Sequence, residues 1–158
     1  MGHSIIKYQD RSEVMSDTDA HLTPCLVVDT LRRSPRLGLT LTPHVRSLLD
    51  VWTSAETYWI PGGINLQLDE HLTSDSDRQC LQVALAETIK RLEDIGPVLT
   101  AGLLEQVVGP RSAAAYGDRA TEKAIQALRR LDRLIKWDFR GAGDLSARST
   151  GNSGNDDV

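Results

Sequence analysis

The chain lacks long apolar runs and is poor in cysteine. Nowhere among its 158 residues do apolar side chains continue for the roughly 20 positions that a membrane-spanning helix needs. Residues 1–10 show no basic region followed by an apolar stretch, so we expect neither secretion nor membrane insertion. The two cysteines, Cys25 and Cys80, lack the short spacing of a zinc site and fit free thiols in a reducing compartment. We therefore expect a cytoplasmic protein.

Catalytic motifs are missing as well. No serine or cysteine stands in a turn context that would pair it with a histidine as an activated nucleophile. Gly62 and Gly63 lack the further glycine and the strand-to-helix setting of a phosphate-binding loop. The sequence thus predicts no catalytic residue, no cofactor and no metal.

The composition is that of an acidic globular protein. A formal net charge of -4 gives no overall attraction to nucleic acid or anionic lipid. Hydrophobic residues make up 40% and charged residues 25%, which is ordinary for a folded domain. We expect one globular domain over residues 1–140. Residues 141–158 are rich in Gly, Ser, Asn and Asp, and we expect them to form a disordered tail.

The chain is dominated by three amphipathic segments that are bounded by helix start and stop signals. They cover residues 43–59, 77–95 and 118–138. Their apolar residues recur at intervals of three and four, which is typical of helices that bury one face. Thr42 caps the first segment, Ser76 with Gln79 forms a capping box for the second, and Asp118 caps the third. The predicted inward residues are Val45, Leu48, Leu49, Trp52, Ala55, Trp59, Leu81, Leu85, Thr88, Ile89, Leu92, Ile95, Ala124, Leu128, Leu131 and Ile135.

Shorter elements complete a mainly α fold. Residues 4–8 favour a short edge strand, and Thr23 with Pro24 marks the start of a helix that ends before Pro35. The β-branched pair Val27 and Val28 leaves a buried strand as the alternative to this helix. A second helical run covers residues 98–108, followed by a linker over residues 111–117. Residues 37–41 and 64–68 alternate with a period of two and can pair as one small β-hairpin. We therefore predict a single-domain helical bundle of about five helices.

Asp69, Glu70 and His71 form the densest cluster of groups suited to metal binding or acid–base chemistry. Their spacing matches neither a calcium loop nor a zinc-binding helix. Acidic residues are also stabilised near a helix N-terminus, so a structural role is the preferred interpretation. Asp69 and Glu70 nevertheless remain candidate contacts for a partner.

The last amphipathic segment carries a basic stripe, Arg129, Arg133, Lys136 and Arg140, with Arg130 nearby and Trp137 available for stacking. Asp132 and Asp138 dilute its charge. We favour a solvated face or a docking site for an acidic protein over a surface that binds nucleic acid.

Aromatic residues are few and unevenly placed. Three of them, Trp52, Tyr58 and Trp59, fall within eight positions. Trp52 and Trp59 share one helical face, so core packing is favoured, and the alternatives are an interface contact or the wall of a ligand site. Tyr58 points elsewhere and is the better candidate for an exposed contact.

Function is assigned by elimination. We expect a non-enzymatic, intracellular protein that binds another protein, such as an adaptor, an accessory protein or a toxin-neutralising partner. One alternative is a small metal-dependent enzyme that uses Asp69, Glu70 and His71. The other is nucleic-acid binding through the basic face of the last helix.

Overall fold

The computed structural model describes residues 2–55 and 62–136. Within these residues 70% of the chain is helical, which confirms the mainly α prediction. The elements, in chain order, are β1 (His3–Tyr8), β2 (Arg11–Ser16), α1 (Asp17–Arg33), α2 (Pro35–Gly38), α3 (Pro43–Ala55), α4 (Leu68–His71), α5 (Asp75–Ile95), β3 (Val98–Leu99), α6 (Ala101–Tyr116), β4 (Arg119–Ala120) and α7 (Thr121–Ile135). The predicted tail, residues 141–158, lies outside the described part.

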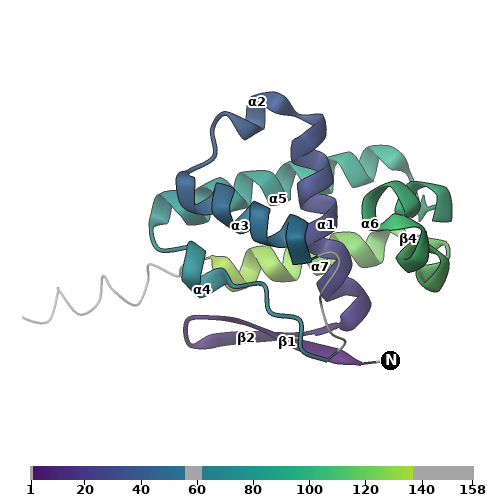
Figure 1. Ribbon diagram of the computed structural model, residues 1–158, viewed down its shortest axis with the longest axis horizontal. Coiled ribbons are helices and arrows are strands. Elements are labelled where there is room, and N and C mark those ends of the chain that lie inside the picture. Colours follow the sequence, from purple (N-terminus) through teal and green to yellow (C-terminus); the bar gives the residue numbers. More distant parts are fainter. Residues whose placement is uncertain (1, 56–61, 137–158) are drawn as a thin grey trace, which may run out of the picture.

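Three long helices form the centre of the fold. α5 and α7 pack along each other, and α1 crosses both of them (Figure 1). α3 packs against α1 and α5, while α6 covers another part of α1. The β1–β2 hairpin contacts α7 and α1 along one side of the bundle. The buried apolar side chains of all these helices join one core cluster among the described residues.

α1 begins earlier than predicted. Thr23 and Pro24 lie in the middle of this helix, so their interpretation as its first residues was wrong. The start is set by Ser16, whose side chain accepts a hydrogen bond from the Asp19 N–H. Every residue from 20 to 28 is buried, because the helix crosses the centre of the bundle. Its end before Pro35 is as predicted.

The predicted β-hairpin was wrong in its location. Pro35 begins the short helix α2, so residues 37–41 form no strand. In the second run, Gln67 has a φ of 54°, which interrupts an extended chain. The observed hairpin pairs β1, the predicted edge strand, with β2, a run that looked merely polar in the sequence. Residues 9 and 10 make the connecting turn.

The long amphipathic segments fold as predicted, with shifted boundaries. Twelve of the predicted inward residues of α3, α5 and α7 are buried, while Ile89 and Ile95 are half-buried against the core. Trp59 lies outside the described residues. The cap of α5 is Ser74 rather than Ser76, and it accepts a hydrogen bond from the Asp77 N–H. The prediction of Asp118 as the cap of α7 was also wrong. Asp118 instead accepts the N–H of Ala101 at 2.8 Å, and α7 begins at Thr121.

The region between α5 and α7 is more regular than predicted. The helix predicted over residues 98–108 begins only at Ala101, so the prediction was wrong for Val98 and Leu99, which form β3 and pair antiparallel with β4. The expected linker over residues 111–117 is mostly helical, because α6 continues to Tyr116 across a kink at Gly109. Gly109 has a φ of 82°, a conformation that glycine adopts without a steric cost.

Two further predictions concern the thiols and the membrane. Cys25 is buried and Cys80 is half-buried. Across residues 2–55 and 62–136, no helix has the length and apolarity required to span a bilayer.

Candidate binding groove

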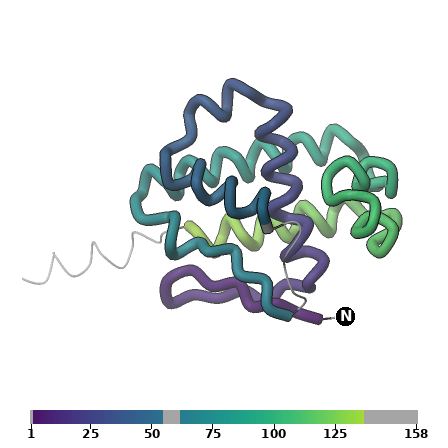
Figure 2. The backbone as a smooth tube through the Cα atoms, in the orientation of Figure 1, coloured from purple at the N-terminus to yellow at the C-terminus, as the bar shows by residue number. Residues whose placement is uncertain are grey.

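A groove of about 480 Å³ runs between strand β1 and the segment that leads into α4. Figure 2 shows this segment descending from α4 to the hairpin. Such a volume lies within the range of about 300–1,000 Å³ that is typical of binding sites. On the strand side the groove is lined by His3, Ile5 and Lys7, and on the other side by Gly62, Gly63, Ile64, Asn65, Gln67, Leu68, Asp69 and Glu70. We call it the β1 groove.

The hydrogen-bond register directs one edge of β1 toward this groove. In an antiparallel pair, residues that exchange hydrogen bonds across the strands alternate with residues that do not. The Asp17 N–H donates to the Gly2 carbonyl at 3.1 Å, and Tyr8 pairs with Arg11 across the two-residue turn. The even-numbered residues of β1 therefore bond to β2. The N–H and C=O groups of His3, Ile5 and Lys7 point away from β2.

No third strand covers that edge in the described residues, where β1 pairs with β2 alone. The hydrogen bonds seen among residues 2–55 and 62–136 outside helices and strands also leave the backbone of His3, Ile5 and Lys7 unused. The Ile5 side chain is 57% exposed, and its cross-strand partner Val14 is 54% exposed. The strand thus offers an open edge beside a partly apolar surface.

The opposite wall is fixed to the hairpin at both ends. At one end the Ile64 N–H donates to Ser4 Oγ at 3.2 Å. At the other end the Gln9 N–H donates to Asp69 Oδ1 at 2.6 Å. In between, Leu66 is buried and its carbonyl accepts a hydrogen bond from Trp52 Nε1 at 3.0 Å. The wall is held near β1 without forming a strand ladder with it.

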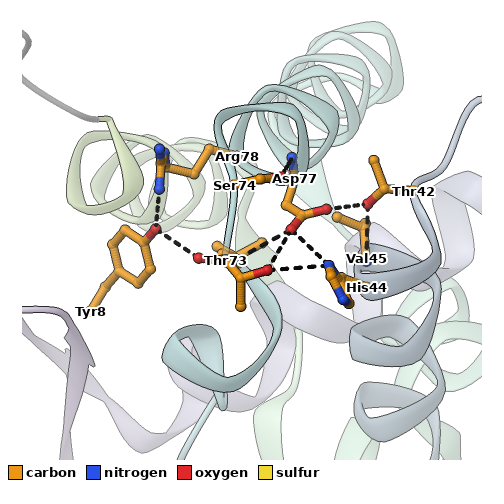
Figure 3. Close-up of polar contacts among 9 residues, drawn as sticks. Tyr8, Thr42, His44, Val45, Thr73, Ser74, Asp77 and Arg78 are labelled. Carbon is orange, nitrogen blue, oxygen red and sulfur yellow. Dashed lines mark hydrogen bonds and ion pairs between the residues drawn. The ribbon is translucent and has the colours of Figure 1, made fainter.

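Tyr8 anchors the strand to the helices behind it (Figure 3). Its hydroxyl donates to the Leu72 carbonyl at 3.1 Å and accepts a hydrogen bond from Arg78 Nη1 at 3.0 Å. The side chain is buried, so both bonds are shielded from water. This contact connects the end of β1 to the residue after α4 and to the first turn of α5.

Replacing Tyr8 with phenylalanine should lower the free energy of unfolding by about 2 kcal/mol. The ring still fills its site, but the Leu72 carbonyl and the Arg78 guanidinium each lose a buried partner. Urea unfolding of both proteins measures the difference. A change below about 0.5 kcal/mol, the size expected for a surface substitution, would contradict the anchoring role.

A second polar cluster centred on Asp77 joins α3 to α5 (Figure 3). Asp77 is 2% exposed and lies at the start of α5. It accepts hydrogen bonds from Thr42 Oγ1 at 2.6 Å and from the Thr73 N–H at 3.2 Å, and His44 Nδ1 lies 3.0 Å away. The carboxylate therefore holds together the N-terminal ends of two helices.

Burial alone would raise the pKa of the Asp77 carboxyl, since a low dielectric disfavours its charged form. Hydrogen bonds from Thr42, His44, Ser74 and Thr73 outweigh burial and lower the pKa from 3.8 to about 2. The folded state therefore holds the ionised carboxylate more tightly than the unfolded chain does.

This lowered pKa predicts a pH-dependent contribution to stability. It is fully present above the unfolded pKa of about 3.9 and is lost as the pH falls toward 2, with a size of about 2 kcal/mol. We expect the stability difference between the wild type and Asp77→Asn to shrink by about that amount between pH 5 and pH 2. The other carboxyls are present in both proteins, so their contributions cancel in the stability difference. A difference that stays constant over this range would contradict the assignment.

The acidic cluster predicted from the sequence is only partly brought together. Asp69 and Glu70 are exposed and line the β1 groove. The His71 side chain contacts the residues just before it, because its Nδ1 lies 3.0 Å from the Gln67 carbonyl oxygen. No group of three or more metal-ligating side chains is found in the part of the chain that the structure describes.

The predicted basic stripe lines a separate surface depression of about 600 Å³ on α7. Arg129 lies 3.9 Å from Glu93 and 3.7 Å from Glu122, and Lys136 lies 2.7 Å from Asp132. Carboxylates therefore offset part of its positive charge. Arg133 also lines this depression.

The remaining candidate residues, Tyr58, Trp59, Trp137 and Arg140, lie outside the described residues. The strand side of the groove, His3, Ile5 and Lys7, was not singled out from the sequence. Their alternation with inward Ser4, Ile6 and Tyr8 was the available signal, but the open edge depends on pairing with β2.

Comparisons with protein-family models, with curated proteins and with solved structures find no match for this chain. We therefore infer function from the geometry of the β1 groove.

Proposed function

We propose that this chain is a non-enzymatic protein-binding module that holds its partner in the β1 groove. The observation that carries the proposal is the open edge of β1. There the backbone groups of His3, Ile5 and Lys7 point toward a groove whose opposite wall is fixed to the hairpin. Unpaired strand edges readily pair with other chains, and natural proteins usually protect them. An edge left open beside a groove can therefore serve as a binding surface.

The lining of the groove suits a protein partner. Lys7 stands on the strand side, and Asp69 and Glu70 stand on the opposite wall, with exposed Ile5 between polar neighbours. Such a mixture of an apolar centre and charges of both signs is common at protein interfaces. Charges at the rim contribute mainly to the association rate and to specificity.

Position-dependent photo-crosslinking in the cells that make the protein tests this proposal. A photoreactive amino acid placed at Glu70 should capture a discrete partner, because Glu70 lines the groove. The same amino acid at Leu39, which is 83% exposed and follows α2, should not capture it. Capture at Glu70 should be lost on adding Ile5→Glu and kept on adding Val14→Glu.

The two glutamate substitutions are matched, since Ile5 and Val14 are cross-strand neighbours with similar exposure. Equal capture from Glu70 and Leu39, or equal sensitivity to both substitutions, would argue against binding in the β1 groove.

A further inference from the structure

We infer that the partner enters the β1 groove as an extended peptide, adds a strand to the free edge of β1, and carries a lysine or arginine toward Asp69 and Glu70. This inference rests on the proposed function and specifies the kind of partner segment that the groove fits.

The hydrogen-bonding pattern of the edge selects an extended chain. His3, Ile5 and Lys7 each offer one N–H and one C=O on the same side of β1. Successive members of this set are about 7 Å apart, the two-residue repeat of a β-strand. Only an extended segment presents complementary groups at the same repeat, because a helix uses its backbone groups internally.

The size of the site indicates a short segment. From His3 to Lys7 the strand extends about 13 Å. The groove of about 480 Å³ continues along this length between the fixed points at Ser4 and Asp69. The open edge therefore matches the length of a peptide of about five residues.

The charges favour a basic residue in the peptide. Two carboxylates, Asp69 and Glu70, face one lysine, Lys7, across the groove. Neither carboxylate forms an ion pair within residues 2–55 and 62–136. A lysine or arginine in the peptide would supply the missing positive charge, while exposed Ile5 favours an apolar side chain next to it.

A second copy of this chain fits the groove less well. Antiparallel pairing of two β1 strands about Ile5 would place His3 of each copy opposite Lys7 of the other. It would also bring two Asp69–Glu70 walls of like charge toward the same interface, in a chain of net charge -4.

Selection of displayed random ten-residue peptides on the folded full-length chain provides the probe. We expect the selected peptides to share a basic residue and alternating apolar residues. One synthetic peptide is then N-methylated at each position in turn, which removes one backbone donor at a time. Methylation at alternate positions should weaken binding about tenfold, and methylation between them should change it less than about twofold.

A matched pair of protein variants identifies the strand edge. Ile5→Pro removes an N–H that faces the groove, and Val14→Pro removes the equivalent outward N–H on β2. Neither N–H belongs to the β1–β2 ladder. Affinity for the synthetic peptide should fall about tenfold in Ile5→Pro and stay within about twofold in Val14→Pro. Circular dichroism establishes that each variant is folded. Glu70→Lys reverses one negative charge of the groove without altering the backbone, and so tests the preference for a basic residue in the peptide.

Three results would overturn the inference: no enriched peptides, N-methylation effects without alternation, or equal losses in the two proline variants. A concentration-dependent dimer that Ile5→Pro abolishes would also overturn it and would identify a second copy as the occupant. If Glu70 still captures a partner in the crosslinking experiment, the proposed function stands and only the strand-addition geometry fails. If Glu70 captures nothing, the proposed function itself fails.

Discussion

Replacing Trp52 with alanine should lower the free energy of unfolding by about 4 kcal/mol, the largest effect expected for any single substitution considered. Trp52 is fully buried in α3, and truncating a buried tryptophan typically costs about 3–5 kcal/mol. The change also leaves the Leu66 carbonyl without the hydrogen bond from Trp52 Nε1. Because Leu66 belongs to the wall of the β1 groove, we expect the wall to loosen as well.

Urea unfolding at neutral pH measures this loss, and two control variants separate its causes. Trp52→Phe keeps most of the ring volume but removes the hydrogen bond, so it should cost about 1–2 kcal/mol. Leu39→Ala removes an aliphatic side chain that is 83% exposed and should cost less than about 0.5 kcal/mol. A Trp52→Ala effect no larger than that of Leu39→Ala would mean that Trp52 does not occupy the core.

Replacing Asp77 with alanine should cost about 3 kcal/mol at neutral pH. The substitution removes the acceptor shared by Thr42 Oγ1 and the Thr73 N–H, so both donors lose this partner, and half-buried Thr42 is only partly reached by water. It also releases the contact between the ends of α3 and α5. The wall of the groove is affected indirectly, since Thr73 follows α4 by two residues.

Ser76→Ala serves as the control for Asp77→Ala because Ser76 lies in the same first turn of α5 but is exposed. Its replacement should change the unfolding free energy by less than about 0.5 kcal/mol. Comparing Ser76→Ala with Ser74→Ala also tests which serine caps α5. Ser74→Ala should cost about 1 kcal/mol, because it removes the side chain that accepts the Asp77 N–H. Equal effects of Asp77→Ala and Ser76→Ala would contradict the role of the Asp77 cluster.

Helical periodicity carried most of what the sequence predicted about the fold. The inward faces of α3, α5 and α7 follow from the recurrence of apolar residues, which is a local property. The start of α1 was misplaced because Thr23 and Pro24 have the composition of a helix start, whereas burial at the centre of the bundle places them mid-helix. Strand β2 was missed because of its six residues only Met15 is buried.

The candidate site was predictable only on its acidic side. Asp69 and Glu70 were singled out because charged residues adjoin in the sequence, and both line the groove. The open edge at Ile5 depends on the register between β1 and β2 and on hydrogen bonds such as Ile64 to Ser4. The Ile64–Ser4 hydrogen bond joins residues 60 positions apart, and no local sequence pattern encodes such a contact.

Hydrogen exchange of the β1 amides in the free, full-length chain tests the open strand edge most directly. The account predicts alternation: the N–H groups of Ser4, Ile6 and Tyr8 bond to β2 and should exchange slowly, while those of His3, Ile5 and Lys7 should exchange about a hundredfold faster. Uniformly slow exchange along the strand would show that the edge is already covered, and would contradict the account.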